Sequence, residues 1–305
     1  MPPPELCGIL NIDKPKGLTS HDVVAQVRRL SGQRRVGHSG TLDPLATGVL
    51  LLCLGQATRV SEYLVASEKT YRAGIRLGVS TDTYDSEGQV IQQAEWEHVT
   101  RDQVAKALQG MLGPLQQTPP MYSAIKHQGT PLYRLARRGE TVERRPRQVM
   151  IHAADLLEWN APHLEVRIRC SKGTYIRSLA HDLGQQLGCG AHLTSLTRLA
   201  VGRFQLEKAF TLDQVQAAAE KGELRSLLLP MDAALQSLPS ATVDADLAAR
   251  IRFGQRIQLP GAPQGGLLRA YTTDGALLAL LRSHRQGEWQ PHKVFLSREN
   301  DESHP

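Results

Sequence analysis

The sequence predicts an α/β (α+β) protein made of two unequal domains. With 305 residues, the chain is longer than a typical single domain of about 100–200 residues. Up to about residue 240, apolar runs typical of strands alternate with segments whose apolar residues recur at helical spacing. Beyond that point, short strand-like runs are separated by Gly and Pro. We therefore expect a larger domain over residues 1–239 and a small β-rich domain over 240–305.

The first elements lead towards a long loop. Residues 6–12 are typical of a strand, and the sequence DKPKG at 13–17 indicates a turn, because Pro and Gly punctuate it. Thr19, with Asp22 three residues later, resembles the capping box that begins many helices. A helix should therefore follow this turn.

The loop at residues 37–48 is rich in Gly, Ser and Thr, and it should lie between rigid elements. A strand is expected at 49–54, followed by a helix over about 57–65. The segment 69–79 is typical of another strand. After a polar loop, residues 100–112 indicate a short amphipathic helix that begins with a capping box.

A strict alternation of apolar and charged residues from Leu164 to Cys170 predicts a half-buried strand. The segment 171–177 follows it directly, and a helix is expected to run from there to about Leu187. A functional group on segment 171–177 would therefore be held between the end of a strand and the start of a helix.

The composition is that of an ordinary folded protein, with 41% hydrophobic and 22% charged residues. The longest apolar run, residues 49–54, is far shorter than the roughly 20 residues of a membrane span. The N-terminus has no secretory pattern, so we expect a cytoplasmic protein. The cysteines form no zinc or redox motif and are expected to be buried, reduced thiols: Cys7, Cys53, Cys170 and Cys189.

The positive charge is concentrated between residues 121 and 147, within a chain whose net charge is +6. Seven basic residues stand there against two acidic ones, a pattern that is often only a solvated surface. Tyr122, His127 and Tyr133 lie among these charges, however, and stacking groups among cations suit unpaired RNA. We therefore expect a segment that grips RNA, with these cations as candidates: Lys126, Arg134, Arg137 and Arg138.

The loop GHSGTLDPLATG at 37–48 is the most informative stretch. From the residues alone, Asp43 could simply cap a turn, which is a frequent role for Asp before Pro. A serine-hydrolase elbow needs G-x-S-x-G, and GHSGT lacks the last glycine. A phosphate-binding loop needs Gly-Lys-Ser/Thr, which is also absent. The loop therefore favours neither acyl transfer nor hydrolysis of a nucleoside triphosphate.

The longer run GHSGTLDPLATGVLLLCLGQATR, which begins at residue 37, resembles the catalytic motif of the TruB family of tRNA pseudouridine-55 synthases. Four further segments are similar to that family in order and spacing: NIDKPKG at 11–17, KTY at 69–71, GTYIRSL at 173–179 and LTSLTRL at 193–199. Taken together, these segments extend the resemblance over residues 8–205.

The resemblance implies a mixed, mainly antiparallel sheet with flanking helices, the pseudouridine synthase fold, and a C-terminal domain of the PUA type. It also implies a reaction at position 55 in the T loop of tRNA. The enzyme would break the N1–C1′ bond of a flipped-out uridine, turn the uracil and rejoin it through C5. Because nothing is added or removed, we expect no cofactor and no metal. The expected partner is the T arm of tRNA, bound by a monomer.

Three residues match the chemistry of the family. Asp43 matches the catalytic aspartate, and an ionised carboxylate is a suitable nucleophile. A pocket that excludes water would favour its neutral form, so a cation should lie beside it, and Arg177 matches the partner arginine. Tyr71 matches a tyrosine that can stack on the uracil or relay a proton. We favour stacking, because a phenol with a pKa near 10 is mostly protonated at neutral pH.

Other matches concern substrate binding. Tyr175 and Leu196 match residues that pack against the base, although both types are also common in an ordinary core. His38 matches the residue that fills the space left by the extruded nucleotide. Lys14 matches a residue that supports the active-site loop, with a phosphate contact as an alternative. The basic segment 121–147 falls where the family carries an insertion that closes over the T arm.

Two other classes of function stay open at this point. A non-catalytic RNA-binding or RNA-folding protein could use the same charges, although a carboxylate facing phosphates gives a binder no advantage. A glycosidase or nucleoside hydrolase would need a second carboxylate, for which Asp82 and Asp85 are weak candidates. For a synthase, the sequence leaves open whether Asp43 attacks C6 or C1′, or whether a proton is lost from C2′.

Overall fold

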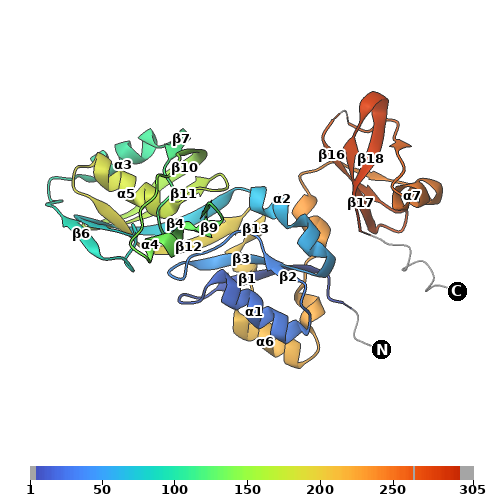
Figure 1. Cartoon of the computed structure of the whole chain (residues 1–305), viewed down its shortest axis with the longest axis horizontal. Coiled ribbons are helices and arrows are strands. Elements are labelled where there is room, and N and C mark those ends of the chain that lie inside the picture. Colours follow the sequence, from blue (N-terminus) through green and yellow to red (C-terminus); the bar gives the residue numbers. More distant parts are fainter. Residues whose placement is uncertain (1–4, 264, 296–305) are drawn as a thin grey trace.

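The structure is a computed structural model that describes residues 5–263 and 265–295. The end of the expected C-terminal domain, residues 296–305, lies outside the described residues. Figure 1 shows a large part that contains the long sheet and a smaller β-rich part near the C-terminus. This arrangement agrees with the predicted fold class.

A mixed sheet of nine strands forms the centre of the large part, in the order β1-β3-β12-β4-β11-β10-β7, with β2 beside β3 and β13 beside β12. All pairs are antiparallel except β3 with β12. The strands are β1 (Gly8–Lys14), β2 (Val36–His38), β3 (Thr47–Leu54), β4 (Lys69–Leu77), β7 (Gly113–Gln117), β10 (Arg147–Asn160), β11 (His163–Cys170), β12 (Ala191–Val201) and β13 (Phe204–Gln205).

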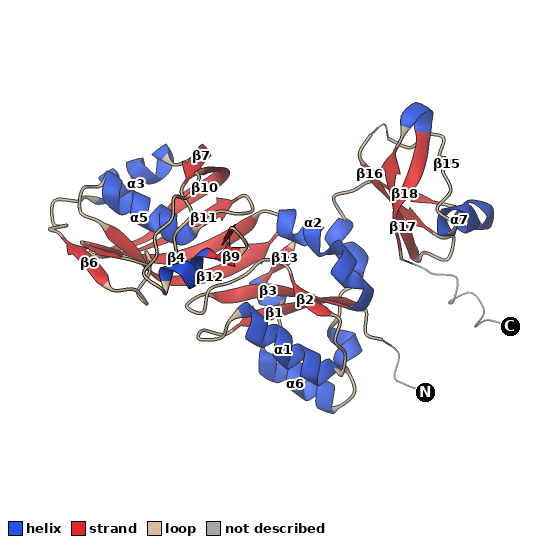
Figure 2. Cartoon of the chain, viewed as in Figure 1, coloured by secondary structure: helices blue, strands red, loops and turns tan. Residues whose placement is uncertain are grey.

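Helices cover the sheet at both ends (Figure 2). At one end α1 (Ser20–Ser31) and α6 (Leu212–Glu220) pack together near β1, and at the other α3 (Arg101–Gly110) and α5 (Ile176–Gln186) pack together. The shorter helices are α2 (Ser61–Ala66) and α4 (Leu132–Ala136). Two small hairpins complete this part: β5 (Val79–Thr81) with β6 (Val90–Gln93), and β8 (Lys126–His127) with β9 (Thr130–Pro131).

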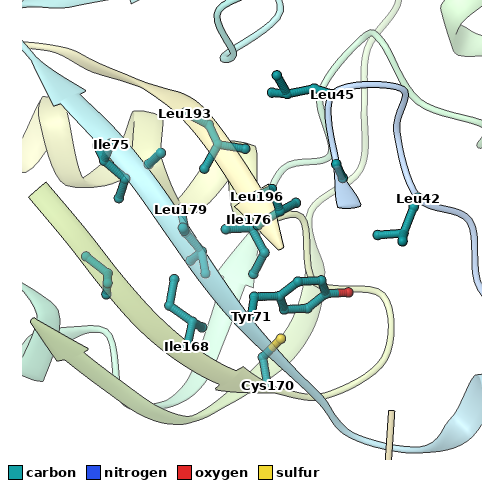
Figure 3. Close-up of a cluster of buried hydrophobic side chains, with 14 of the residues drawn as sticks. Leu42, Leu45, Tyr71, Ile75, Ile168, Cys170, Ile176, Leu179, Leu193 and Leu196 are labelled. Carbon is teal, nitrogen blue, oxygen red and sulfur yellow. The ribbon is translucent and has the colours of Figure 1, made fainter. Parts of the chain in front are cut away.

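The apolar patterns account for this packing. Strand β3 is buried along almost its whole length, as its continuous apolar run requires. Strand β4 alternates between buried and more exposed positions, so one of its faces meets the core. Figure 3 shows Tyr71 of β4 reaching from this core towards the loop that carries Leu42, with Leu179 of α5 and Leu196 of β12 nearby. The core therefore ends where the loop 37–48 lies.

Both predicted capping boxes are present. The Thr19 hydroxyl accepts the Asp22 N–H at 3.1 Å, and the Asp22 carboxylate accepts the Thr19 N–H at 2.8 Å. Thr100 and Gln103 form the same reciprocal pair at the start of α3. The predicted helix at 57–65 is shorter than expected, because residues 55–60 form a 3-10 turn before α2.

The predicted burial of all four cysteines is wrong for Cys7, which is exposed, whereas the other three are buried. Cys7 stands just before β1 begins, so no strand pairing covers it. All four thiols are free, as expected.

The small part is a five-stranded sheet in the order β14-β16-β17-β18-β15 with one helix. It has its own apolar core, which includes Ile251, Leu281 and Trp289. The elements are β14 (Ser240–Thr242), α7 (Ala245–Arg252), β15 (Ile257–Gln258), β16 (Leu267–Tyr271), β17 (Leu277–Ser283) and β18 (Glu288–Val294). Strand-like runs alone were expected here, and α7 corrects this: Asp244 caps it by accepting the Leu247 N–H at 2.8 Å.

A third apolar cluster joins the two parts, with Val60 and Leu235 packed against Leu280 and Phe295. Beside it, the Lys293 ammonium donates to the Arg59 carbonyl at 2.5 Å, and the Arg59 guanidinium donates to the Val294 carbonyl at 2.5 Å. Polar and apolar contacts thus hold the small part on α2 and the turn before it.

None of the helices in the described residues combines the length and the apolar character that crossing a bilayer requires.

Replacement of the α1 cap tests the assignment of its N-terminus. Thr19→Ala removes the hydroxyl that accepts the Asp22 N–H, so we expect the free energy of unfolding to fall by about 1 kcal/mol. Thr19→Ser keeps the hydroxyl and should stay close to wild type. Urea denaturation of the three proteins measures the difference, and equal stability of Thr19→Ala and Thr19→Ser would contradict the assignment.

Candidate active site

A pocket of about 260 Å³ opens between the loop after β2 and the strands at the centre of the sheet. Its wall is formed by the loop 40–43, the start of β4, the segment 171–177, β12 and residues 123–124. Five residues expected from the sequence meet in its lining, although they come from distant parts of the chain: Asp43, Tyr71, Tyr175, Arg177 and Leu196.

The loop that carries Asp43 is held by short polar contacts on both sides. The Ser20 hydroxyl, at the start of α1, accepts the Leu42 N–H at 2.8 Å and donates to the Leu42 carbonyl at 3.1 Å. The Gly17 N–H donates to the Pro44 carbonyl at 2.8 Å. These bonds satisfy backbone groups that a loop would otherwise expose, and they fix the position of Asp43 between them.

Arg198 of β12 anchors the other side of this loop. Its side chain is buried; Nε donates to the Val49 carbonyl at 2.7 Å and Nη2 donates to the Gly40 carbonyl at 3.0 Å. Gly48 passes so close that a Cβ would lie 2.3 Å from the Arg198 carbonyl oxygen, and its φ of 94° is one that favours glycine. The loop and β12 therefore fit together only with glycine at this position.

Asp43 forms an ion pair with Arg177, with 3.0 Å between Oδ2 and Nε. Both Nη atoms of Arg177 also have partners: Nη1 is 3.2 Å from Asp85 Oδ2 and donates to the Thr83 carbonyl at 3.2 Å, and Nη2 donates to the Tyr122 carbonyl at 2.8 Å. Arg177 and Asp85 are buried, whereas the Asp43 side chain is 40% exposed. The guanidinium is thus held in place, and the Asp43 carboxylate is the exposed member of the pair in the pocket.

Burial raises the pKa of Asp43 above its ordinary value, and the Arg177 guanidinium opposes that rise. Asp85 adds to the rise, because a second negative charge disfavours ionisation, whereas the Lys14 ammonium opposes it. The site therefore contains a carboxylate that is costly to ionise but has two cations to stabilise its charged form.

Tyr71 is buried, and burial raises its pKa above 10. A proton is then harder to remove from the phenol than in water, which agrees with stacking and counts against a role as base. Tyr175 lies at the N-cap of α5, with the Arg147 guanidinium 4.5 Å from the centre of its ring. Leu196 completes the apolar side of the pocket.

Two residues expected at the substrate do not line the pocket. The Lys14 side chain is fully buried and donates to the Pro15 carbonyl at 2.8 Å and the Leu18 carbonyl at 2.7 Å. The Lys14 side chain therefore has no exposed surface in this structure, which favours support of the loop over the alternative of a phosphate contact. Burial lowers the pKa of Lys14 to about 8.

His38 ends β2 and packs edge to face on His21, with ring centres 5.3 Å apart. Among the described residues its Nδ1 has no hydrogen-bond partner. Burial, with His21 and Arg198 adding to the effect, lowers its pKa to about 4, so it is neutral at physiological pH. It stands beside the pocket rather than in its wall.

The basic segment contains α4 and the β8–β9 hairpin. Its four candidate residues are exposed and lie outside the pocket lining: Lys126, Arg134, Arg137 and Arg138. The Arg134 and Arg137 guanidinium groups lie 6.0 Å and 5.7 Å from the centre of the Tyr133 ring. The segment thus presents cations and an aromatic ring outside the pocket.

Several residues of the site were missed from the sequence. Asp85 was considered only as an acid or base, Arg198 was quoted within a motif without a role, and Gln117 was not singled out. Lys69 also lines the pocket; its ammonium donates to the Val65 and Ser67 carbonyls at 2.6 Å, and burial lowers its pKa to about 8. One indication of these missed residues was available in the sequence: Arg198 is a charged residue inside an apolar strand pattern.

No group of three or more His, Cys, Asp or Glu side chains within residues 5–263 and 265–295 is arranged to hold a metal ion.

Models of known families match most of the chain. The model described as TruB family pseudouridylate synthase (N terminal domain) matches residues 28–176. The model described as tRNA pseudouridylate synthase B C-terminal domain matches residues 177–236. A third, described as pseudouridine synthase II TruB, C-terminal, matches residues 239–280.

Curated relatives are similar over nearly their full length. A protein of Dehalococcoides mccartyi, named tRNA pseudouridine synthase B, is 48% identical over 95% of this chain and 97% of its own. A Burkholderia mallei protein of the same name is 45% identical over 96% of this chain and 98% of its own.

Solved structures are similar in fold. A chain of an H/ACA RNP bound to a substrate RNA containing 2′-deoxyuridine has a TM-score of 0.74 and 27% identity, over 96% of this chain and 86% of its own. A chain of a Cbf5–Nop10–Gar1 complex has a TM-score of 0.74 and 28% identity with the same coverage.

Replacement of Arg198 tests its role as an anchor of the loop. Arg198→Met leaves the buried Val49 carbonyl and the half-buried Gly40 carbonyl without this donor, so we expect a loss of about 1–3 kcal/mol of stability, mainly from the Val49 carbonyl. Arg198→Lys can still donate to one carbonyl and should lose less. Chemical denaturation measures both variants, and a Met variant as stable as wild type would contradict the anchor.

Proposed function

Because the chain belongs to the TruB family and is a tRNA pseudouridine synthase, an isomerase, we propose that it converts the uridine at position 55 in the T loop of tRNA to pseudouridine, with Asp43 as the nucleophile. One observation supports this most directly: within the Asp43–Arg177–Asp85 cluster, Asp43 lines the pocket with a side chain that is 40% exposed, whereas Arg177 and Asp85 are buried. A carboxylate in that position is a suitable nucleophile for attack on a base or a ribose.

The reaction keeps every atom of the nucleotide. The N1–C1′ bond breaks, the uracil turns, C5 bonds to C1′, the C5 proton is lost and N1 gains a proton. Asp43 begins it by attack on C6 or C1′, or the route passes through loss of a C2′ proton. In each case Arg177 stabilises the ionised Asp43, because its guanidinium is already fixed before substrate arrives.

The pocket suits one extruded base. Its volume of about 260 Å³ lies below the roughly 300–1,000 Å³ of sites for drug-sized ligands. We assign Tyr71 to stacking on the uracil, and Tyr175 and Leu196 to packing against it. His38 is assigned to the space that the flipped nucleotide leaves, a role that its neutral ring permits. Lys14 is assigned to support of the Asp43 loop through the turn that it holds.

We also propose separate roles for different parts of the chain. Residues 1–239 carry the chemistry, and the basic segment 121–147 grips the backbone of the T arm. Residues 240–305 form a PUA-like RNA-binding domain. The protein acts on tRNA as a monomer, because one chain supplies the whole pocket.

The decisive experiment is pseudouridine mapping of an unmodified tRNA transcript incubated with the pure protein and no cofactor. Wild type should modify the T-loop uridine at position 55, whereas Asp43→Asn, which keeps the shape but not the charge, should yield no detectable product. Asp102→Asn, at the exposed start of α3, is the matched control and should behave as wild type. Binding without modification by wild type would favour the alternative of a non-catalytic RNA-binding protein.

The raised pKa of Asp43 predicts how the reaction rate falls at low pH. Only the ionised carboxylate attacks, and a raised pKa means that protonation removes it at a higher pH than for a free aspartate. The single-turnover rate at saturating enzyme should therefore fall with decreasing pH around a midpoint above 3.8. In Arg177→Met the residual rate should show a still higher midpoint, because a cation that lowers the pKa is gone. A wild-type midpoint at or below 3.8 would contradict the assignment.

A further inference from the structure

Gln117, the last residue of β7, binds both backbone polar groups of Tyr175. Its side-chain Oε1 accepts the Tyr175 N–H at 2.7 Å, and its Nε2 donates to the Tyr175 carbonyl at 3.0 Å. Gln117 has no exposed surface. Two hydrogen bonds from one buried amide to one residue leave the Tyr175 backbone little freedom to move.

This contact fixes the N-cap residue of a helix from outside the helix. Tyr175 occupies the N-cap position of α5, and its side chain makes no capping hydrogen bond. Most helices begin with Ser, Thr, Asp or Asn, whose side chains bind the free N–H groups there. Here an aromatic side chain stands at that position and lines the pocket. A residue 58 positions away supplies a polar partner to the backbone at this helix start.

Neighbouring contacts fix the same place. Arg147 is the cross-strand partner of Gln117, and its guanidinium stacks on the Tyr175 ring and binds the Gly173 carbonyl. One residue beyond Gln117, the Thr118 carbonyl accepts the Ser178 hydroxyl at 3.2 Å. The end of the β7–β10 ladder therefore contacts the ring of Tyr175, its backbone and the first turn of α5.

We propose that Gln117 is a positioning residue for the isomerisation: by fixing the backbone of Tyr175, it sets where the Tyr175 ring and the Arg177 guanidinium stand relative to the base and to Asp43. The inference rests on the proposed function of this pocket. Gln117 does not line the pocket, so it acts only through Tyr175 and the start of α5. Arg177 follows two residues later, and a shift of the helix start would move its guanidinium away from the Asp43 carboxylate.

The test compares Gln117→Met with Gln116→Met in the full-length protein and tRNA transcript. Met has a similar length but cannot form either bond to Tyr175. Gln116 is the exposed neighbour on the same strand and serves as the matched control. Single-turnover pseudouridine formation at saturating enzyme, tRNA affinity and the thermal unfolding midpoint are measured for each protein.

We expect Gln117→Met to fold and to bind tRNA within about twofold of wild type, with a single-turnover rate lower by about 10–100-fold, as small misplacements of reacting groups produce. Gln116→Met should match wild type in all three measurements. A Gln117→Met variant with the wild-type rate would overturn the inference. So would a loss of rate that only follows a loss of tRNA affinity, because that would assign Gln117 to binding.

If Gln117→Met does not fold, Gln117→Glu takes its place, since it keeps an acceptor for the Tyr175 N–H. Failure of both variants to fold would assign Gln117 to stability and would also overturn the inference. A wild-type protein that makes no pseudouridine would overturn the proposed function together with the inference. An active wild type beside an equally active Gln117→Met would overturn the inference alone.

Discussion

The ion pair between Asp43 and Arg177 is the contact on which the rest of the site depends. A carboxylate that must shed water to admit a base loses its charge unless a cation stays close to it. That cation is itself costly to bury, and Arg177 is satisfied by Asp85, by the Thr83 carbonyl and by the Tyr122 carbonyl. Two separate segments, residues 83–85 and the one that carries Tyr122, therefore have to be in place around Arg177 before one carboxylate can be held ionised at the pocket.

Two other buried cations have a different task. Lys14 and Arg198 donate to main-chain carbonyls on either side of the loop that carries Asp43. A loop of this length has many backbone carbonyls that no helix or strand pairs. A long basic side chain on a neighbouring strand can donate hydrogen bonds to such carbonyls. The charges of Lys14 and Arg198 lie near enough to affect the pKa values of Asp43 and His38, respectively. The same two side chains therefore support the loop and affect the pKa values of its titratable groups.

The sequence predicts the fold class, both capping boxes and the pocket residues that belong to recognisable motifs. Asp43, Tyr71, Tyr175, Arg177 and Leu196 were found because each lies in a segment that resembles a motif of the TruB family. Asp85 and Gln117 were not, because their roles exist only through partners 92 and 58 residues away. For Lys14 the sequence left a phosphate contact open, because a lysine in a turn is usually solvated, and only the structure shows that its buried side chain donates to main-chain carbonyls. Local pattern identifies chemistry-bearing residues, whereas the residues that hold them emerge from long-range packing.

The basic segment and the pocket cannot be treated as independent. The Tyr122 carbonyl, near one end of the segment, binds Arg177, and Arg147, at its other end, stacks on Tyr175. The exposed cations between these ends are therefore carried by a piece of chain that is attached at both sides to the groups around the base. RNA that binds the segment would therefore contact a piece of chain that is hydrogen-bonded to Arg177, the proposed partner of Asp43. The proposed recognition of RNA by this segment and the proposed placement of the reacting groups therefore depend on the same contacts of Tyr122 and Arg147.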